Sequence, residues 1–284
     1  MNSQPRPVYN AIDLTQRYSS GEREFDHVNL AGSNLNRANL VGIALWGSKL
    51  QGIQLQGAQL QGANLSGSNL SGADLYRANL SQSNLLQADC SKANLSQANL
   101  ERATLAVGNF SETNLTAANL VGCDLREARL AKARLNEADL SGADLSGANL
   151  SGASLWEARL KDTQLRGAEL LKTELWDAKL QGADLTKANL SGGSDLWQAD
   201  LTRANLSQAN LAGAKLWEAN LTGANLAGAN LVGADLRGAI LSGAMYDDYT
   251  HFDQGFDPAS HGMNKVTTLE SQNTANQLRS ANPL

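Results

Sequence analysis

Few residues in this 284-residue chain could carry out catalysis or bind a metal. The histidines and cysteines are His27, His251, His261, Cys90 and Cys123. No two histidines have the His-x-x-x-His spacing that places two ligands on one helix face. The serines have no neighbouring histidine that could act as their general base. The sequence therefore predicts no catalytic residue, no metal site and no cofactor site.

The tryptophans are more informative, because this residue type is enriched among the side chains that dominate protein–protein binding energy. Trp46, Trp156, Trp176, Trp197 and Trp217 each directly follow a leucine. The last four are separated by 20, 21 and 20 residues. Whether they lie side by side depends on the backbone that positions them.

That backbone is built from a five-residue repeat. A large apolar residue occupies every fifth position from 25 to 190 and, after one six-residue step, from 196 to 241, which makes 44 positions. Leucine fills 41 of them, and the exceptions are Phe25, Cys90 and Phe110. The residue two positions earlier is small, with alanine in 30 of 43 cases. A period of five fits neither a helix nor a long strand, so the repeat predicts short extended segments joined by turns.

Each unit predicts one short strand and one corner. The small residue and the leucine are two positions apart, so both point inward from an extended segment. The second position after the leucine holds 21 of the 26 glycines, as expected for a type II turn that needs a positive φ there. Four corners close a square, so the 44 units form about 11 coils of about 20 residues. We expect corners without glycine to avoid a positive φ, and these include Arg77, Gln82, Gln87, Lys92, Gln97 and Arg102.

Units such as Ala63-Asn64-Leu65-Ser66-Gly67 resemble those of the pentapeptide repeat family, and the leucine-rich centre is similar to its cyanobacterial branch. The resemblance implies an all-β fold, a right-handed four-sided β-helix, in which stacked coils cover one another's leucines. It also implies a non-enzymatic scaffold or regulatory protein that acts through protein contacts, as a cyanobacterial relative does in regulating heterocyst differentiation. The expected partner is therefore another protein.

Four regions are expected along the chain. Residues 1–24 contain a tail and a helical cap over 10–20, which begins at the pair Asn10 and Asp13. Residues 25–245 form the β-helix. Residues 246–263 keep four aromatic side chains and are expected to cover the last coil. Residues 264–284 are polar and lack periodicity, which predicts a flexible tail.

The six-residue step falls in Ser191-Gly192-Gly193-Ser194, which can hold the extra residue as a bulge at a corner. The coil that contains the bulge then has 21 residues instead of 20, and residues beyond it stay in the same columns. The last four tryptophans are therefore expected to stack on consecutive coils about 5 Å apart. Tyr76 lies lower in this column, and Arg237 follows Trp217, where we expect a cation–π contact. The predicted partner-binding residues are therefore Trp156, Trp176, Trp197, Trp217, Tyr76 and Arg237. Trp46 lies in another column.

Two interpretations of the column remain open: a docking surface for a protein, or a stack that only stiffens the rod. The alternative function is a DNA mimic that modulates a type II topoisomerase, as in the quinolone-resistance members of the resembled family. The net charge of −5 is mild and mixed in sign, which favours neither that role nor direct nucleic-acid binding. A flat face that binds carbohydrate or ice is a third class.

The sequence contains no run of 18 apolar residues, and residues 1–9 are too polar for a signal peptide. Cys90 replaces an inward leucine and Cys123 an inward alanine, so both are expected to be buried and unbridged. Two cysteines in a chain of this length indicate a reducing compartment. We expect a cytoplasmic protein, with a peripheral position at the thylakoid surface as one option. Nothing in the sequence indicates its oligomeric state.

Overall fold

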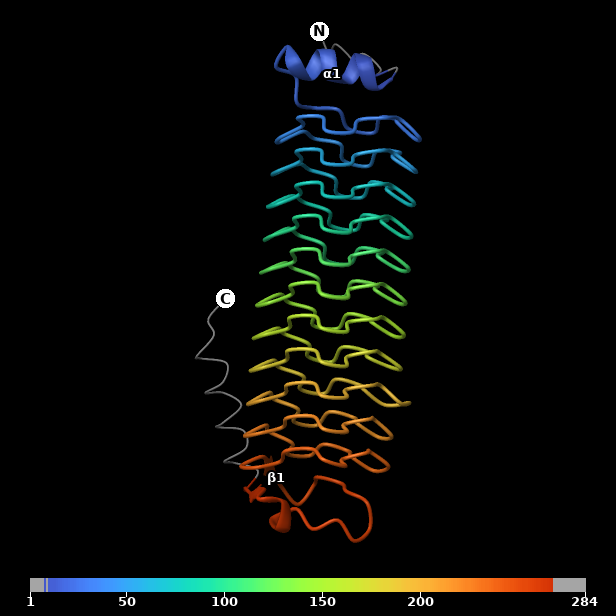
Figure 1. Ribbon diagram of the computed structural model, residues 1–284. Coiled ribbons are helices and arrows are strands. Elements are labelled where there is room, and N and C mark those ends of the chain that lie inside the picture. The colour runs from blue at the N-terminus through green and yellow to red at the C-terminus, as the bar shows by residue number, and fades with distance from the viewer. Residues whose placement is uncertain (1–7, 9, 268–284) are drawn as a thin grey trace.

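The computed structural model describes residue 8 and residues 10–267. Figure 1 shows a straight rod of stacked coils, with helix α1 (Ala11–Ser19) at the N-terminal end and a looped segment at the other. The other named elements are β1 (Met245–Tyr246), the 3-10 helix η1 (Ala259–His261) and β2 (Asn264–Lys265). Among the described residues, no helix has the length and apolar character that crossing a bilayer requires.

Isolated parallel bridges hold the coils together. The residue before each inward leucine pairs with its counterpart one coil later, as Asn64 does with Asn84. The Leu65 N–H donates to the Asn84 carbonyl at 2.7 Å, and the Asn84 N–H donates to the Ala63 carbonyl at 2.9 Å. The same pattern recurs on four sides, so four units make one coil of the β-helix. Because one residue per side forms the bridge, long strands are absent from the described part of this β-helix.

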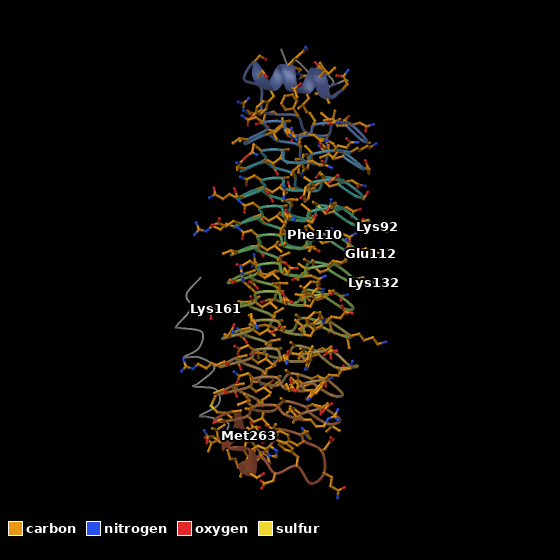
Figure 2. The ribbon with its side chains drawn as sticks, viewed as in Figure 1. Lys92, Phe110, Glu112, Lys132, Lys161 and Met263 are labelled. Carbon is orange, nitrogen blue, oxygen red and sulfur yellow. The ribbon has the colours of Figure 1, made fainter. Side chains whose placement is uncertain are left out.

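The leucines fill the interior. Every inward position of the repeat from Phe25 to Leu231 is at most 4% exposed, and Leu241 is also buried. Leu236 is the exception, and it is partly exposed. Figure 2 shows Phe110 inside the rod. A β-carbon at Gly108 would lie 2.6 Å from the Phe110 ring, so the small inward position before this phenylalanine has to be glycine.

The expectation for corners without glycine is wrong. The φ angles of Arg77, Gln82, Gln87, Lys92, Gln97 and Arg102 lie between 54° and 58°. The reason is the hydrogen bond that the N–H of each of these six residues makes to a carbonyl of the next coil. The Gln82 N–H donates to the Glu101 carbonyl at 2.8 Å, as the Gly62 N–H does to the Ser81 carbonyl at 3.0 Å. This bond requires one backbone conformation whichever side chain is present.

Corner side chains accordingly form straight columns along the rod. Lys92, Glu112 and Lys132 have φ angles of 58°, 59° and 57° and lie at one edge of successive coils (Figure 2). The outer surface is therefore a set of parallel rows whose members recur every coil.

Helix α1 lies over the first coil (Figure 1). It follows Asn10, whose Oδ1 accepts the Asp13 N–H at 2.9 Å, and its Leu14 is buried. The Arg17 guanidinium lies 5.4 Å from the centre of the Phe25 ring and pairs with Glu22 at 2.5 Å. Helix α1 begins one residue later and ends one residue earlier than the helix expected over 10–20.

At the other end, four rings form a chain of contacts. Tyr246, Phe252, Phe256 and His261 have successive centroid separations of 6.0, 4.8 and 4.6 Å. Strand β2 pairs in parallel with β1, which corrects the expected boundary at residue 264: residues 264 and 265 belong to the closing segment. The remaining expected tail, 268–284, lies outside the described residues, as do residues 1–7 and 9.

Cys90 and Cys123 are both buried free thiols, as expected. Burial raises the pKa of the Cys90 thiol far above its ordinary range and that of the Cys123 thiol to about 12. Both thiols therefore stay protonated at neutral pH.

Because the thiolate is the reactive form, neither cysteine should react with a thiol reagent at about pH 8 in the folded chain. The measurement is a colorimetric thiol count with and without denaturant. The expected result is almost no reaction when folded and both thiols when unfolded. Rapid reaction of the native chain would contradict the described burial.

Val107 tests the corner geometry, because a β-branched residue with φ of 59° is strained. Val107→Gly should stabilise the chain by about 1 kcal/mol, since relief of strain outweighs the added freedom of glycine in the unfolded state. Val121 is the first residue after its inward leucine, whereas Val107 is the second, and Val121 does not have a positive φ. Val121→Gly should destabilise by about 0.5–1 kcal/mol. The urea midpoint should rise for Val107→Gly and fall for Val121→Gly. A decrease in both variants would refute the strained, positive-φ conformation of Val107.

Candidate functional site

The extra residue loops out at one corner. Gly192 and Gly193 have φ angles of 75° and 87°, and Ser194 occupies the next small inward position. The Ser194 hydroxyl donates to the Leu170 carbonyl at 2.6 Å. Asp195 then forms its bridge with Glu174, 21 residues earlier. The prediction that later residues stay in column is confirmed.

Four tryptophans stack along one edge of the rod as a result. We call Trp156, Trp176, Trp197 and Trp217 the tryptophan ladder. Successive ring centroids are 5.1, 6.4 and 5.9 Å apart, with interplanar angles of 8°, 38° and 27°. The widest and most tilted step joins Trp176 to Trp197, the pair on either side of the bulge. The predicted column is therefore present, with two steps wider than the expected 5 Å.

The ladder presents ring edges rather than ring faces. Each inner ring has a neighbouring indole on both faces: one neighbour is near-parallel, and the other is tilted by 38° across the Trp176–Trp197 step. Trp217 is 46% exposed, whereas the other three are half-buried. The Trp197 indole N–H is buried without a hydrogen-bond partner in the described chain. A ligand that needs an open aromatic face finds none along the middle of the ladder.

An acidic row follows the ladder at the next position of each unit. It consists of Glu157, Asp177, Gln198 and Glu218. Lys179 donates to Asp177 at 2.7 Å, and Gln198 donates to Glu218 at 2.8 Å. Glu157 and Glu218 form no ion pair within the described part of the chain. The border therefore retains negative charge beside the rings.

The other two members of the column lie apart from the ladder. Tyr76 lies four coils before Trp156, and the Arg77 guanidinium lies 5.0 Å from the centre of the Tyr76 ring. Arg237 does not make the expected cation–π contact with Trp217. Its Nε and Nη2 instead donate to the Asp235 carboxylate at 2.8 and 2.6 Å. A bidentate carboxylate two residues away holds the guanidinium in that position.

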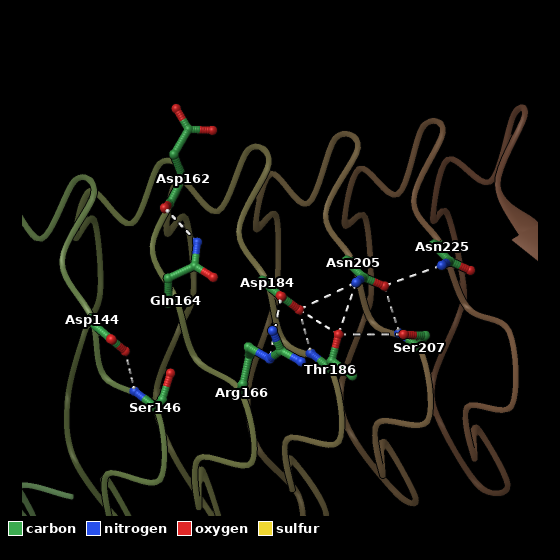
Figure 3. A network of polar contacts seen from close by, with 10 residues as sticks. All are labelled: Asp144, Ser146, Asp162, Gln164, Arg166, Asp184, Thr186, Asn205, Ser207 and Asn225. Carbon is green, nitrogen blue, oxygen red and sulfur yellow. Dashed lines mark hydrogen bonds and ion pairs between the residues drawn. The ribbon is translucent and has the colours of Figure 1, made fainter. Parts of the chain in front are cut away.

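A buried polar cluster on another side of the rod was not predicted. Thr186 Oγ1 donates to Asp184 Oδ1, and Asn205 Nδ2 donates to Thr186 Oγ1 at 2.8 Å (Figure 3). Asn225 Nδ2 continues the chain to Asn205 Oδ1 at 3.2 Å, and Arg166 Nε lies 3.7 Å from Asp184. These bonds join successive coils, which indicates a structural role. The sequence signal was the 21- and 20-residue spacing of these polar residues once the bulge is counted.

The histidines lie apart. His27 packs edge-on against Trp46 at 4.3 Å, while His251 and His261 lie in the closing segment. Among the described residues, no group of three or more histidine, cysteine or acidic side chains could hold a metal ion.

Comparison with known proteins identifies the repeat. The family model described as pentapeptide repeats matches in 8 copies, over residues 38–75, 73–106, 109–147, 143–175, 172–208 and 204–243. No curated protein sequence matches the chain significantly.

Three solved structures illustrate the similarity. HetL, a pentapeptide repeat protein involved in heterocyst differentiation regulation from the cyanobacterium Nostoc sp. strain PCC 7120, is 32% identical over 84% of this chain and 97% of its own (TM-score 0.39). Rfr23 from the cyanobacterium Cyanothece 51142 is 38% identical over 39% and 64% (TM-score 0.19). QnrB1, a plasmid-mediated fluoroquinolone resistance protein, is 18% identical over 81% and 91% (TM-score 0.40).

The looped-out residue can be removed as a test. Deleting Gly193 leaves an ordinary five-residue unit, so the ladder should persist and the thermal midpoint should stay the same or rise. Deleting Gly182, at a corner with no extra residue, should shift every later side chain by one position and unfold that half of the rod. Near-UV circular dichroism of the stacked indoles and thermal unfolding distinguish the two. Loss of the indole signal on deleting Gly193 would show that the bulge aligns the ladder.

Proposed function

This chain belongs to the pentapeptide repeat family, and from that premise we propose that it is a non-enzymatic rod that binds another protein through the tryptophan ladder. The observation that carries the proposal is the continuity of the ladder: four large aromatic side chains on four consecutive coils, held by a rigid backbone. Pre-positioned aromatic side chains lose little entropy on binding, which suits them to be binding anchors. Tyr76 and Arg237, in the same column, form the outer ends of the proposed surface.

The border of the ladder suggests the chemistry of that partner. The acidic row beside the rings favours a partner segment that carries lysine or arginine next to apolar side chains. The two inner rings have neighbours on both faces, so a carbohydrate would find only the end rings to stack on, which makes it a poorer fit than a protein. We therefore propose an apolar and basic protein surface as the ligand.

The DNA-mimic alternative has less support. A mimic needs a long row of negative charge, but the corner column of Lys92, Glu112 and Lys132 alternates in sign. The acidic row beside the ladder is short and interrupted by Gln198. A protein-binding scaffold accounts for the rings and the charges together.

The finer features of the fold enter this proposal. We propose a right-handed rod of about 11 coils, from residue 25 to 245, with residues 1–24 providing the cap α1 and the closing segment extending from 246 to 265. No cofactor is required. Two reduced, buried cysteines suit a cytoplasmic location.

The experiment compares capture of partner proteins from a cyanobacterial lysate by the wild type and by the double variant Trp176→Ser, Trp197→Ser. Capture should be lost, because the two central anchors are removed. The thermal midpoint should fall by only a few degrees, since ring stacking contributes about 0.5–1.5 kcal/mol per pair.

Trp46→Ser is the matched control, because Trp46 is 47% exposed but lies in another column. It should retain capture. Unchanged capture by the double variant would refute the docking role. Unfolding of the double variant would instead show that the ladder is structural.

A further inference from the structure

Leu236 is the one inward leucine of the repeat that is partly exposed. It lies in the last coil, on the side that carries the tryptophan column. On this side the last bridge joins Asp235 to Lys215 of the preceding coil. No described residue forms a bridge with Asp235 from the C-terminal side. The next side ends in the same way at Ile240, which is 51% exposed. The parallel bridges of the rod therefore end on these two sides, where no further coil follows.

The other two sides continue into the closing segment. Asn225 pairs with Met245, and Asn230 pairs with His251. Asp253 Oδ1 also accepts the Gly233 N–H at 2.8 Å, so a side chain satisfies a donor that another coil would have bound. The lack of a partner at Asp235 is therefore a local feature of the end of the rod.

Backbone groups are left unpaired at this place. Elsewhere on this side, each coil boundary has three hydrogen bonds, such as Asp235 N–H to Ala214 O at 2.9 Å, Leu216 N–H to Asp235 O at 2.9 Å and Glu218 N–H to Arg237 O at 3.0 Å. One coil later, the equivalent groups are the Ala234 carbonyl and the N–H groups of Leu236 and Gly238. None of the three has a hydrogen-bond partner in the described chain. We call residues 234–238 the open edge.

An apolar pocket adjoins the open edge. Its volume is about 310 Å³, and its apolar walls come from Leu231, Ala234, Leu236, Phe252 and Phe256. The charged groups at its rim are already bound: Asp235 by Arg237, and Asp253 by Gly233. Ala234 and Leu236, the two inward residues of this side of the last coil, form part of its wall.

We propose that the open edge binds an extended segment of a partner protein by parallel strand addition, and that this segment carries a small residue and a large apolar residue two positions apart. The residue between them donates its N–H to the Ala234 carbonyl and accepts from the Leu236 N–H. The small side chain packs on Ala234 and the large one on Leu236, as in every preceding coil. The carbonyl of the residue directly after the large apolar residue accepts from the Gly238 N–H.

A second copy of this chain is a poorer occupant. The described segments with the required pattern are all paired inside the rod. The opposite end of the rod is covered by α1, so one copy cannot continue the coils of another (Figure 1). The open edge shares Arg237 with the docking surface proposed around the tryptophan ladder, but its binding groups are the backbone of residues 234–238 and the Leu236 side chain. The proposal therefore does not depend on the function proposed for the ladder.

The probe is a synthetic, end-capped peptide Gly-Ala-Asn-Leu-Ser-Gly, which copies residues 62–67 of the chain. Amide resonances and hydrogen exchange of the full chain are measured during titration. The Leu236 and Gly238 amides should exchange fast in the free chain and become protected by bound peptide, with a dissociation constant on the order of 1 mM or tighter. A peptide with aspartate in place of leucine should bind at least tenfold more weakly. The variant Trp176→Ser, Trp197→Ser should bind the peptide as the wild type does.

Leu236→Asp should abolish binding, whereas Val232→Asp, on the outer surface of the same coil, should retain it. The wild-type exchange data test the proposal even if Leu236→Asp fails to fold. The absence of protection at several millimolar peptide would overturn it. Protection already present in the free chain would show that the chain occupies its own edge, and protection that grows with protein concentration would show a second copy; either result overturns the proposal.

Discussion

The corner residue of every repeat unit in this rod adopts a left-handed backbone conformation, and at most corners its N–H donates to a carbonyl of the next coil. Corners at His27, Val107 and Ala117 have φ angles of 58°, 59° and 54°, close to those of the glycine corners. Left-handed conformations disfavour ordinary residues by about 1–3 kcal/mol each. Burial of a leucine contributes about 1.5–3 kcal/mol, but only where another coil covers it. The strained corner is therefore stable in a stack and not in a single coil.

The same constraint organises the outer surface. Identical corners place equivalent side chains at one point of each coil, so residues about twenty positions apart become neighbours. The tryptophan ladder, the polar cluster of Asp184, Thr186 and Asn205, and the column through Lys92 all arise in this way. At the C-terminal end of the stack, the same pattern leaves the Ala234 carbonyl and the N–H groups of Leu236 and Gly238 without hydrogen-bond partners in the described chain.

The repeat made much of this predictable from sequence. Counting by fives identified the inward residues. Counting the bulge at Gly193 as one extra residue aligned Trp197 with Trp176 on the next coil. Corner conformations were mispredicted because local preferences of Arg77 or Gln82 were given more weight than the bond to the next coil. The orientation of Arg237 depends on competition between a carboxylate and a ring, which spacing alone does not decide. The pairing of β2 with β1 lies outside the repeat, where the periodic signal is lost.

The four-sided coil also restricts how such a protein can change over generations. A duplication of twenty residues lengthens the rod by one coil and keeps every later side chain in its original column. A duplication of five residues turns everything beyond it by a quarter of a circle and moves an aromatic row to a different face. A single inserted residue, as at Gly193, is absorbed where it occurs. Binding surfaces on this scaffold can therefore be relocated by translation and rotation of whole segments, without the replacement of any side chain.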